Sequence, residues 1–351
     1  MPYASKSLIV QAPGEQFKQG SIDRRDVGSD DVRIRIACCG ICHSDLHQAH
    51  GDWPDTIFPM VPGHEIVGVI EEMGADVPDD FFLGQRVGVG CFVDSCGACR
   101  ACQQGYEQFC RKGQVSTYNA RDYDGEITYG GYSASMTVKA RYVIAIPDAL
   151  DSFDAAPLLC AGVTLFSPLE RWQIGQGSNV ALIGMGGIGH IGVQLAHSLG
   201  ARVTVIGRNA AKREDALRFG ADRYLSIEEM HADDSLLASF GMILNTTAGV
   251  NDLEWYLSLL DVNGVYVPLG LGDANLSFSP PSLFWNNRTV AGSLIGGIAA
   301  NQRSIDYCAA NDVRPEIEVV KATPEGLNAA YERLAKSDVR YRFVLDMTPL
   351  Q

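Results

Sequence analysis

The sequence predicts an α/β protein in which a β-rich part comes first and a doubly wound parallel sheet follows. Short strand-like segments succeed one another up to about residue 150, and strands then alternate with helices from about residue 156. A glycine-rich loop joins one of those strands to the helix after it. At 351 residues the chain is too long for one ordinary core and suits two domains.

The β-rich part is predicted from alternation and punctuation. DVRIRIAC at 31–38 alternates apolar and polar residues with period two, which favours a strand. Further short strands bounded by Gly and Pro are expected at 64–74, 85–91, 132–138 and 142–147.

The rhythm changes in the second part. NVALI at 179–183 reads as a buried strand, and GHIGVQLAHSL at 189–199 reads as a helix that Gly200 ends. The strand RVTVIG and the helix AKREDALRF come next, followed by the apolar strands FGMILNTT, VYVPLG and TVAGSLI. Two helical stretches and the strand YRFVLDM are expected after about residue 298. Strands alternating with helices are typical of a doubly wound parallel sheet.

Charge and composition exclude some function classes. A net charge of -14 argues against a nucleic-acid surface, which needs clustered Lys and Arg. The first residues lack a secretory pattern, and the most apolar window is interrupted by His190, Gln194 and several glycines, so we expect a cytoplasmic protein without a membrane span. Ten cysteines in a reducing compartment indicate metal binding rather than disulfides.

The loop GMGGIG at 184–189 fits the fingerprint of a dinucleotide site and stands between a predicted strand and a predicted helix. Gly184 would make the tight turn, Gly186 would let the backbone approach a pyrophosphate, and Gly189 would let helix and strand pack closely. Gly187 and Ile188 complete the loop. The alternative is a glycine-rich turn that binds nothing.

The end of the next strand, RVTVIG, indicates which dinucleotide is bound, NAD or NADP(H). An NAD site needs an acidic residue about 20 residues after the loop to bind the ribose 2′-hydroxyl. Here Gly207 and Arg208 stand at the strand end, and Lys212 and Arg213 follow. Because a guanidinium binds a 2′-phosphate that a carboxylate would repel, the missing acid predicts NADP(H). The alternative is that these bases merely begin a solvated helix.

Two groups of residues have the chemistry of metal sites. Cys96, Cys99, Cys102 and Cys110 lie within one short segment, and four thiolates at this spacing can enclose a structural zinc ion. Free thiols or disulfides are the alternative. A second group is scattered over CGICHSDLH (39–47), VPGHEIVG (61–68) and PLLCAGVT (157–164). Cysteine, histidine and cysteine from these segments would make a three-ligand zinc site with one open position.

These motifs together resemble the zinc-dependent medium-chain dehydrogenases of alcohol dehydrogenase type, and most closely their cinnamyl-alcohol-dehydrogenase branch. The resemblance runs from residue 38 to residue 347 and includes GHE, the four-cysteine segment, LLCAG, GSLIGG and RYRFV. It implies a GroES-like catalytic domain at 1–155 and 299–351, a Rossmann cofactor domain at 156–298, two Zn²⁺ per chain and a homodimer.

The resemblance also implies roles for single residues. Cys42, His64 and Cys160 would bind the catalytic zinc, with Glu65 as a nearby carboxylate that can approach the metal. Asp45 would orient a ligand, and Ser44 and His47 would relay a proton. His43 would face the cofactor phosphates, Thr164 would lie beneath the nicotinamide, and Leu294 would lie beside the cofactor. The pocket residues would be Gln48, Trp53, Cys91, Ile295 and again Leu294.

Two positions depart from the branch. Plant cinnamyl alcohol dehydrogenases typically carry Trp where this chain has Val115, and the NADP-dependent members carry Ser or Thr where it has Gly207. We expect an NADP(H)-dependent enzyme that interconverts primary alcohols and aldehydes, aromatic or medium-chain, mainly towards the alcohol. The alternatives are an NAD-linked alcohol or polyol dehydrogenase and a catalytically inactive binding protein.

Overall fold

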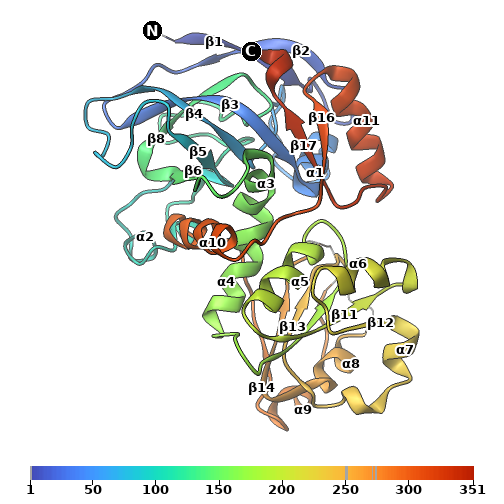
Figure 1. Ribbon diagram of the computed structural model, residues 1–351. Coiled ribbons are helices and arrows are strands. Elements are labelled where there is room, and N and C mark those ends of the chain that lie inside the picture. Colours follow the sequence, from blue (N-terminus) through green and yellow to red (C-terminus); the bar gives the residue numbers. More distant parts are fainter. Residues whose placement is uncertain (1, 250–251, 271, 273–274) are drawn as a thin grey trace. The chain divides into compact units, whose positions relative to one another are not determined.

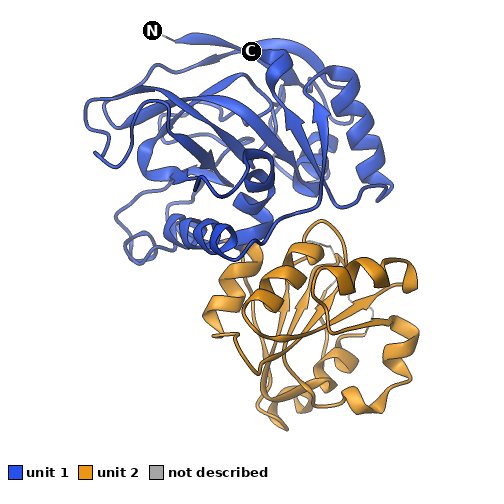
Figure 2. Cartoon of the chain, viewed as in Figure 1, with its two compact units in different colours: residues 1–163, 296–351 blue, residues 164–295 orange. Residues whose placement is uncertain are grey.

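The computed structural model describes residues 2–249, 252–270, 272 and 275–351 and divides into two compact units. Unit 1 comprises Met1–Val163 and Gly296–Gln351, and unit 2 comprises Thr164–Ile295 (Figure 2). The domains predicted from the sequence, 1–155 with 299–351 and 156–298, end near the same positions. Each unit has its own sheet, so each is described by itself.

Unit 1 is built on a seven-stranded sheet in the order β16-β17-β3-β4-β5-β9, with β8 also paired to β3 (Figure 1). The central strand, β3 (Asp31–Ile41), pairs antiparallel with β4, β8 and β17. The other strands are β4 (Ile66–Met73), β5 (Arg86–Val89), β8 (Ser135–Lys139), β9 (Val143–Ala145), β16 (Ile317–Lys321) and β17 (Arg342–Asp346). The five strands predicted before residue 150 all form.

The C-terminal segment completes unit 1. Strand β17 pairs with β3 although some 300 residues of chain separate their registers, for example Phe343 with Ile41. Strand β16 was not predicted, because its five residues, IEVVK, mix three apolar and two charged side chains without a regular alternation. Two small sheets pair β1 (Tyr3–Ile9) with β2 (Lys18–Arg24), and β6 (Phe92–Asp94) with β7 (Val115–Ser116).

Helices of unit 1 carry or flank the candidate site. They are α1 (His43–His50), α2 (Arg100–Gln103), α3 (Ser152–Pro157), α10 (Ile298–Ala310) and α11 (Pro324–Ala335). Between α3 and α4 (Val163–Arg171) the chain makes a π-helical turn, Leu158–Gly162. The stretch Ser152–Arg171 is long and apolar enough to cross a membrane, but 67% of its apolar window is buried inside the protein, as in a core helix.

Unit 2 is a six-stranded parallel sheet in the order β12-β11-β10-β13-β14-β15. The chain leaves β10 (Asn179–Ile183) in one direction through β11 (Arg202–Gly207) and β12 (Arg223–Ser226). It returns beside β10 as β13 (Phe240–Asn245) and continues to β14 (Leu260–Pro268) and β15 (Thr289–Val290). This is the predicted doubly wound order, whose ligand crevice lies where the winding reverses.

Helices connect the parallel strands of unit 2, as parallel pairing requires. They are α5 (Gly189–Ser198), α6 (Arg213–Arg218), α7 (Ile227–His231), α8 (Leu253–Ser258) and α9 (Pro281–Phe284). The predicted strand TVAGSLI is much shorter than expected, since only Thr289 and Val290 pair with β14. The rest of that segment, up to Ile295, forms no strand.

Candidate active site

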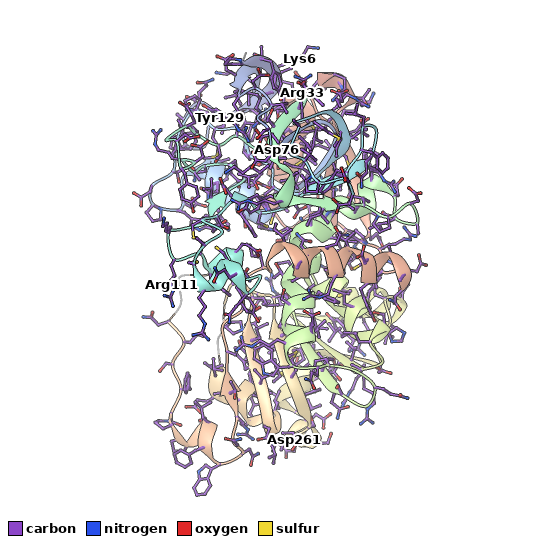
Figure 3. The ribbon with its side chains drawn as sticks, turned by 90° about the vertical axis from the view of Figure 1, so that its left-hand side faces the viewer. Lys6, Arg33, Asp76, Arg111, Tyr129 and Asp261 are labelled. Carbon is purple, nitrogen blue, oxygen red and sulfur yellow. The ribbon has the colours of Figure 1, made fainter. Side chains whose placement is uncertain are left out.

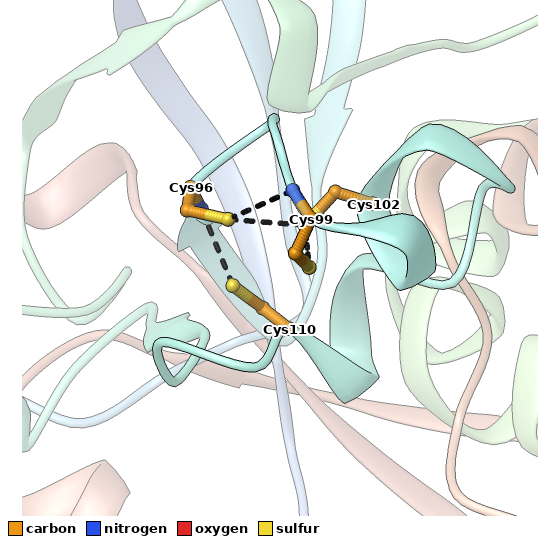
Figure 4. A group of neighbouring side chains, drawn as sticks. All are labelled: Cys96, Cys99, Cys102 and Cys110. Carbon is orange, nitrogen blue, oxygen red and sulfur yellow. Dashed lines mark hydrogen bonds between the residues drawn. The ribbon is translucent and has the colours of Figure 1, made fainter.

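The four-cysteine segment folds into a compact cluster of sulfur atoms (Figure 4). All four Sγ atoms lie within 4.8 Å of one another. Cys96 precedes the short helix α2, Cys99 caps its N-terminus, Cys102 lies in it and Cys110 follows it. Cys99 Sγ and Cys102 Sγ are 3.5 Å apart, and Cys96 Sγ and Cys102 Sγ are 3.9 Å apart. Spacing in the sequence therefore translates into convergence in space.

Backbone N–H groups point at these sulfurs and favour thiolates. The amides of Cys96, Cys99 and Arg111 donate to Cys110 Sγ, Cys96 Sγ and Cys99 Sγ at 3.3, 3.4 and 3.5 Å. Arg111, labelled in Figure 3, follows the last cysteine directly. The amide donors of Arg111 and Cys102 lower the pKa of Cys99 to about 6. Four converging sulfurs with thiolate-stabilising donors fit a closed, structural zinc ion.

A second cluster lies within unit 1 and joins three separate segments. One ligand atom each from Cys42, His64, Glu65 and Cys160 lies within 4.8 Å of the others. Cys42 caps the N-terminus of α1, His64 and Glu65 directly precede β4, and Cys160 belongs to the π-helical turn. π-Helical turns are rare and occur often at functional sites, because they re-aim a side chain. Here the turn carries the Cys160 thiol.

The carboxylate of Asp45 holds this cluster. It is fully buried, and its Oδ2 accepts the Cys42 N–H at 2.9 Å. Its Oδ1 accepts the Gly63 N–H and faces His64 Nδ1, both at 3.1 Å. With Nδ1 committed to a carboxylate, the imidazole offers Nε2 as its ligand atom. Asp45, which is predicted to orient a ligand, therefore contacts two members of the cluster through its two oxygens.

Glu65, the fourth member of the cluster, lies against a buried arginine that was not predicted from the sequence. Arg342 of β17 donates to Glu65 Oε1, and both side chains are almost completely buried. Glu65 Oε2 is buried without a hydrogen-bond partner among the described residues. A Cβ on Gly40 would lie 1.9 Å from that oxygen, so glycine leaves the space it occupies. Burial raises the pKa of Glu65 to about 7 despite Arg342.

The other donors share protons that a bound metal ion would displace. The Cys160 thiol donates to Cys42, which lowers the pKa of Cys42 well below its usual value and raises that of Cys160. Burial lowers the pKa of His64, but Asp45 and the neighbouring thiols outweigh burial and raise it. Two sulfurs competing for one proton, a histidine beside them and an unpartnered carboxylate oxygen together form a donor set that suits zinc.

Two further buried side chains support the ligands. The ring of Tyr118 stacks on His64 with centroids 6.0 Å apart. Asn301 of α10 donates through its amide nitrogen to the carbonyl oxygen of Leu159, one residue before Cys160, at 3.0 Å. Neither residue was singled out from the sequence, because an isolated Tyr or Asn carries no motif.

Helix α1 carries the residues predicted to move a proton. Ser44 is half-buried and His43 is exposed. His47 Nδ1 lies 2.8 Å from Asp52 Oδ2, and the His47 ring stacks on Trp53 with centroids 5.6 Å apart. Asp52 was not predicted. The only sequence feature that could have indicated it is its position next to Trp53, two residues after the end of the helix that carries His47.

The candidate pocket residues are distributed over both units. In unit 1, Gln48 accepts a hydrogen bond from the Asn119 amide, and that Asn119 side chain also accepts the Ile57 N–H at 2.6 Å. Trp53 packs on His47, as described, and Cys91 is half-buried and hydrogen-bonds Cys160. Thr164, Leu294 and Ile295 belong to unit 2, where Thr164 is half-buried and Leu294 is exposed.

The glycine loop of unit 2 has the geometry that its fingerprint predicts. Gly184 has φ 94°, which only glycine adopts readily, and a Cβ on Gly189 would lie 2.2 Å from the Gly184 carbonyl oxygen. A Cβ on Gly186 would meet nothing within 4 Å, so the backbone there is open to a ligand. Gly187 and Ile188 are half-buried, and α5 begins at Gly189. A strand, a glycine loop and a helix N-terminus in this order are the arrangement that binds phosphate groups in dinucleotide-binding folds.

The three basic residues after β11, Arg208, Lys212 and Arg213, differ in their hydrogen-bond partners. Lys212 Nζ donates to the Met185 carbonyl oxygen at 2.7 Å, which ties α6 to the glycine loop. Arg213 pairs with both carboxylate oxygens of Glu229 at 2.7 and 2.6 Å. Arg208 is exposed, and among the described residues no side chain pairs with it. It lines a hollow of about 530 Å³ together with Asn209, Ala210, Ser226, Glu228, Glu229 and Ala232.

Comparison with known proteins gives this arrangement its family. Residues 28–148 match the family described as alcohol dehydrogenase GroES-like domain, and residues 187–310 match that described as zinc-binding dehydrogenase. An NADP-dependent alcohol dehydrogenase C of Mycolicibacterium smegmatis is 48% identical over 338 residues, 96% of each chain. The chain belongs to the zinc-dependent alcohol dehydrogenase family.

Solved structures narrow the family to a branch. A cinnamyl alcohol dehydrogenase from Sorghum bicolor superposes with a TM-score of 0.93 at 36% identity over 99% of both chains. The cinnamyl alcohol dehydrogenase of Helicobacter pylori, in complex with NADP(H), gives 0.91 at 37% identity, also over 99% of both. The chain is therefore similar to the cinnamyl-alcohol-dehydrogenase branch, as its motifs predicted. The predicted fold class, a GroES-like part and a Rossmann part, is confirmed.

We expect Asp45→Asn to weaken zinc binding at the second cluster about 10- to 100-fold, since an amide cannot accept from Cys42, Gly63 and His64 together. Zinc transfer to a colorimetric chelator measures this, with the cysteine cage as an internal reference. Asp55→Asn, a nearby change away from the cluster, is the control. Release at the wild-type rate in Asp45→Asn would show that Asp45 does not hold the ligands.

We expect Asp52→Asn to lower turnover about tenfold with little change in KM, because the carboxylate fixes the orientation of the His47 ring. Steady-state kinetics on the zinc-loaded dehydrogenase provide the measurement, and Asp55→Asn again serves as the control. Equal turnover in both variants would remove Asp52 from the catalytic machinery.

Proposed function

We propose that this protein is an NADP(H)-dependent zinc alcohol dehydrogenase that interconverts primary alcohols and aldehydes and works mainly as an aldehyde reductase. The convergence of Cys42, His64 and Cys160 in one unit carries the proposal, because three such donors leave one zinc position open. A closed four-ligand cage elsewhere in the same chain leaves the chemistry to this cluster. The presence of all three donors argues against an inactive binding protein.

Zinc held by Cys42, His64 and Cys160 would supply a Lewis acid that polarises the substrate carbonyl. The chain's own contribution is to fix the donors. Asp45 orients His64, the π-helical turn presents Cys160, and Arg342 keeps Glu65 within reach of the same point. Two thiolate donors limit the positive charge that the substrate oxygen meets, so that the product alcohol can leave.

The proton for the new alcohol would come through α1. Ser44 would donate its hydroxyl proton to the substrate oxygen, and His47 would restore that proton from solvent. Asp52 accepts from His47 Nδ1, which leaves Nε2 free to exchange protons. A bound reduced nicotinamide would supply the hydride for the aldehyde carbon, and the proton passed along α1 would go to the aldehyde oxygen, which balances the reduction.

The choice of NADP(H) over NAD(H) is supported by the end of β11. No carboxylate occupies that strand end to bind a 2′-hydroxyl, and Arg208 is the exposed cation there. The named relatives support the same choice, since one is called NADP-dependent and another was solved with NADP(H). An NAD-linked alcohol or polyol dehydrogenase is the second candidate.

The substrate would be an aromatic, cinnamyl or medium-chain aldehyde. The relationship to two cinnamyl alcohol dehydrogenases supports an aromatic substrate. Val115 is buried in β7 where the plant enzymes typically carry a Trp, which argues for a less exclusive pocket. None of the ten cysteines, all of which lie in the described part of the chain, forms a disulfide, which supports a reducing, cytoplasmic location. The family resemblance supports a homodimer.

We expect Arg208→Ala to raise the KM for NADPH about 10- to 100-fold and to leave the KM for NADH unchanged, because one charged hydrogen-bonding group to the 2′-phosphate is lost. Initial rates of cofactor oxidation with cinnamaldehyde and with benzaldehyde measure both values. Arg202→Ala, at the opposite end of the same strand, is the control. A wild type that oxidises NADH as well as NADPH would favour the NAD-linked alternative.

We expect Ser44→Ala to lower turnover about 100-fold while zinc content stays at the wild-type level. The pair of measurements separates loss of a proton donor from loss of the metal. Unchanged turnover would exclude the Ser44 hydroxyl from the proton path.

A further inference from the structure

The end of β11 has no room for a side chain. A Cβ built on Gly207 would lie 1.8 Å from the hydroxyl oxygen of Tyr224 and 2.6 Å from its Cζ. The φ angle of Gly207 lies outside the left-handed region, so the backbone itself does not require glycine here. Space therefore requires it, and the occupant of that space is the phenol of Tyr224 on the neighbouring strand β12.

The phenol also fixes the turn that follows β11. Tyr224 is buried, and its hydroxyl donates to the carbonyl oxygen of Asn209 at 2.6 Å. The Asn209 side chain in turn accepts the Ala211 N–H at 3.0 Å, which begins the turn leading into α6. The backbone of Arg208 lies between Gly207, which packs against the Tyr224 phenol, and Asn209, whose carbonyl oxygen the Tyr224 hydroxyl binds. Tyr224 thus determines where the chain presents Arg208.

Arg213, Glu229 and Ser226, which lie close by, are already engaged with one another. The guanidinium of Arg213 lies 5.7 Å from the Tyr224 ring centroid and pairs with Glu229. The Glu229 carboxylate also accepts the Ser226 N–H at 2.7 Å, and the Glu229 backbone N–H donates to the Ser226 hydroxyl oxygen at 3.1 Å. Because the Tyr224 proton is used on Asn209, the phenol cannot donate to a phosphate at the same time. Arg208 is the cation left to face the hollow.

We propose that Tyr224 is a positioning residue for cofactor choice: it replaces the side chain absent at Gly207 and holds the turn from which Arg208 meets the 2′-phosphate. The inference rests on the proposed use of NADP(H). It assigns the selectivity to a pair of residues, 207 and 224, on adjacent strands. Neither residue needs to touch the phosphate.

The contact between Gly207 and Tyr224 reverses the expected effect of a serine at position 207. Adding a hydroxyl at position 207, as in the NADP-dependent members that carry Ser there, should weaken NADPH binding in this chain. The new Cβ cannot enter space that Tyr224 fills without moving the strand end or the phenol. A smaller apolar residue at 224 should make the serine tolerable, so the two changes together should do less harm than Gly207→Ser alone.

The test measures Kd for NADPH and for NADH by nicotinamide fluorescence with the zinc-loaded protein. We expect Tyr224→Phe, which removes one hydrogen bond, to weaken NADPH about three- to tenfold and to leave NADH unchanged. We expect Gly207→Ser to weaken NADPH at least about tenfold, with part of the loss recovered in Gly207→Ser/Tyr224→Leu. Tyr256→Phe, in the apolar core of the same unit, is the matched control.

The outcomes separate the two proposals. A wild type that binds NADH as tightly as NADPH would overturn the cofactor assignment and this inference with it. A wild type that prefers NADPH, with Tyr224→Phe weakening both cofactors equally, would reduce Tyr224 to a structural residue and overturn the inference alone. So would a Gly207→Ser variant that binds NADPH as tightly as the wild type. If Gly207→Ser does not fold, the Tyr224→Phe comparison decides.

Discussion

The catalytic half of the dehydrogenase depends on one buried carboxylate. Asp45 is removed from water, so its charge is tolerable only if both oxygens are satisfied, and they accept from Cys42, Gly63 and His64. Those groups come from the start of α1 and from the loop before β4. The contacts that satisfy the Asp45 charge therefore also fix two of the proposed zinc donors, Cys42 and His64. Stabilising the carboxylate and shaping the site are one requirement.

Long-range packing adds the remaining parts around that carboxylate. The C-terminal strand β17 crosses next to β3 and delivers Arg342 to Glu65, 277 positions away in the sequence. Helix α10 fastens the π-helical turn through Asn301. The four-cysteine cage uses the opposite strategy, because its donors and its N–H···S bonds all come from one short segment. One site is assembled by the fold, and the other is nearly local.

That difference explains what the sequence could predict. The cage followed from spacing alone, and the parallel sheet followed from buried strands alternating with helices. Cys42, His64 and Cys160 could be grouped only through family resemblance, because no local rule links segments so far apart. Asp52, Tyr118, Asn301 and Arg342 were missed because each acts through a contact that a pattern cannot show. From the sequence, Gly207 is only a departure from the Ser or Thr of the branch, whereas the structure shows that Tyr224 fills the space beside it.

The most direct test of this account is the number of zinc ions per chain in the purified protein, measured by elemental analysis with Cys160→Ser and Cys110→Ser beside the wild type. Two clusters of metal donors predict about two zinc ions per wild-type chain and about one in each variant. Activity should disappear in Cys160→Ser, because that variant would lack the zinc ion with the open position. A wild type with only one zinc ion, retained in Cys160→Ser, would show that the Asp45-supported cluster does not bind zinc and would contradict the account.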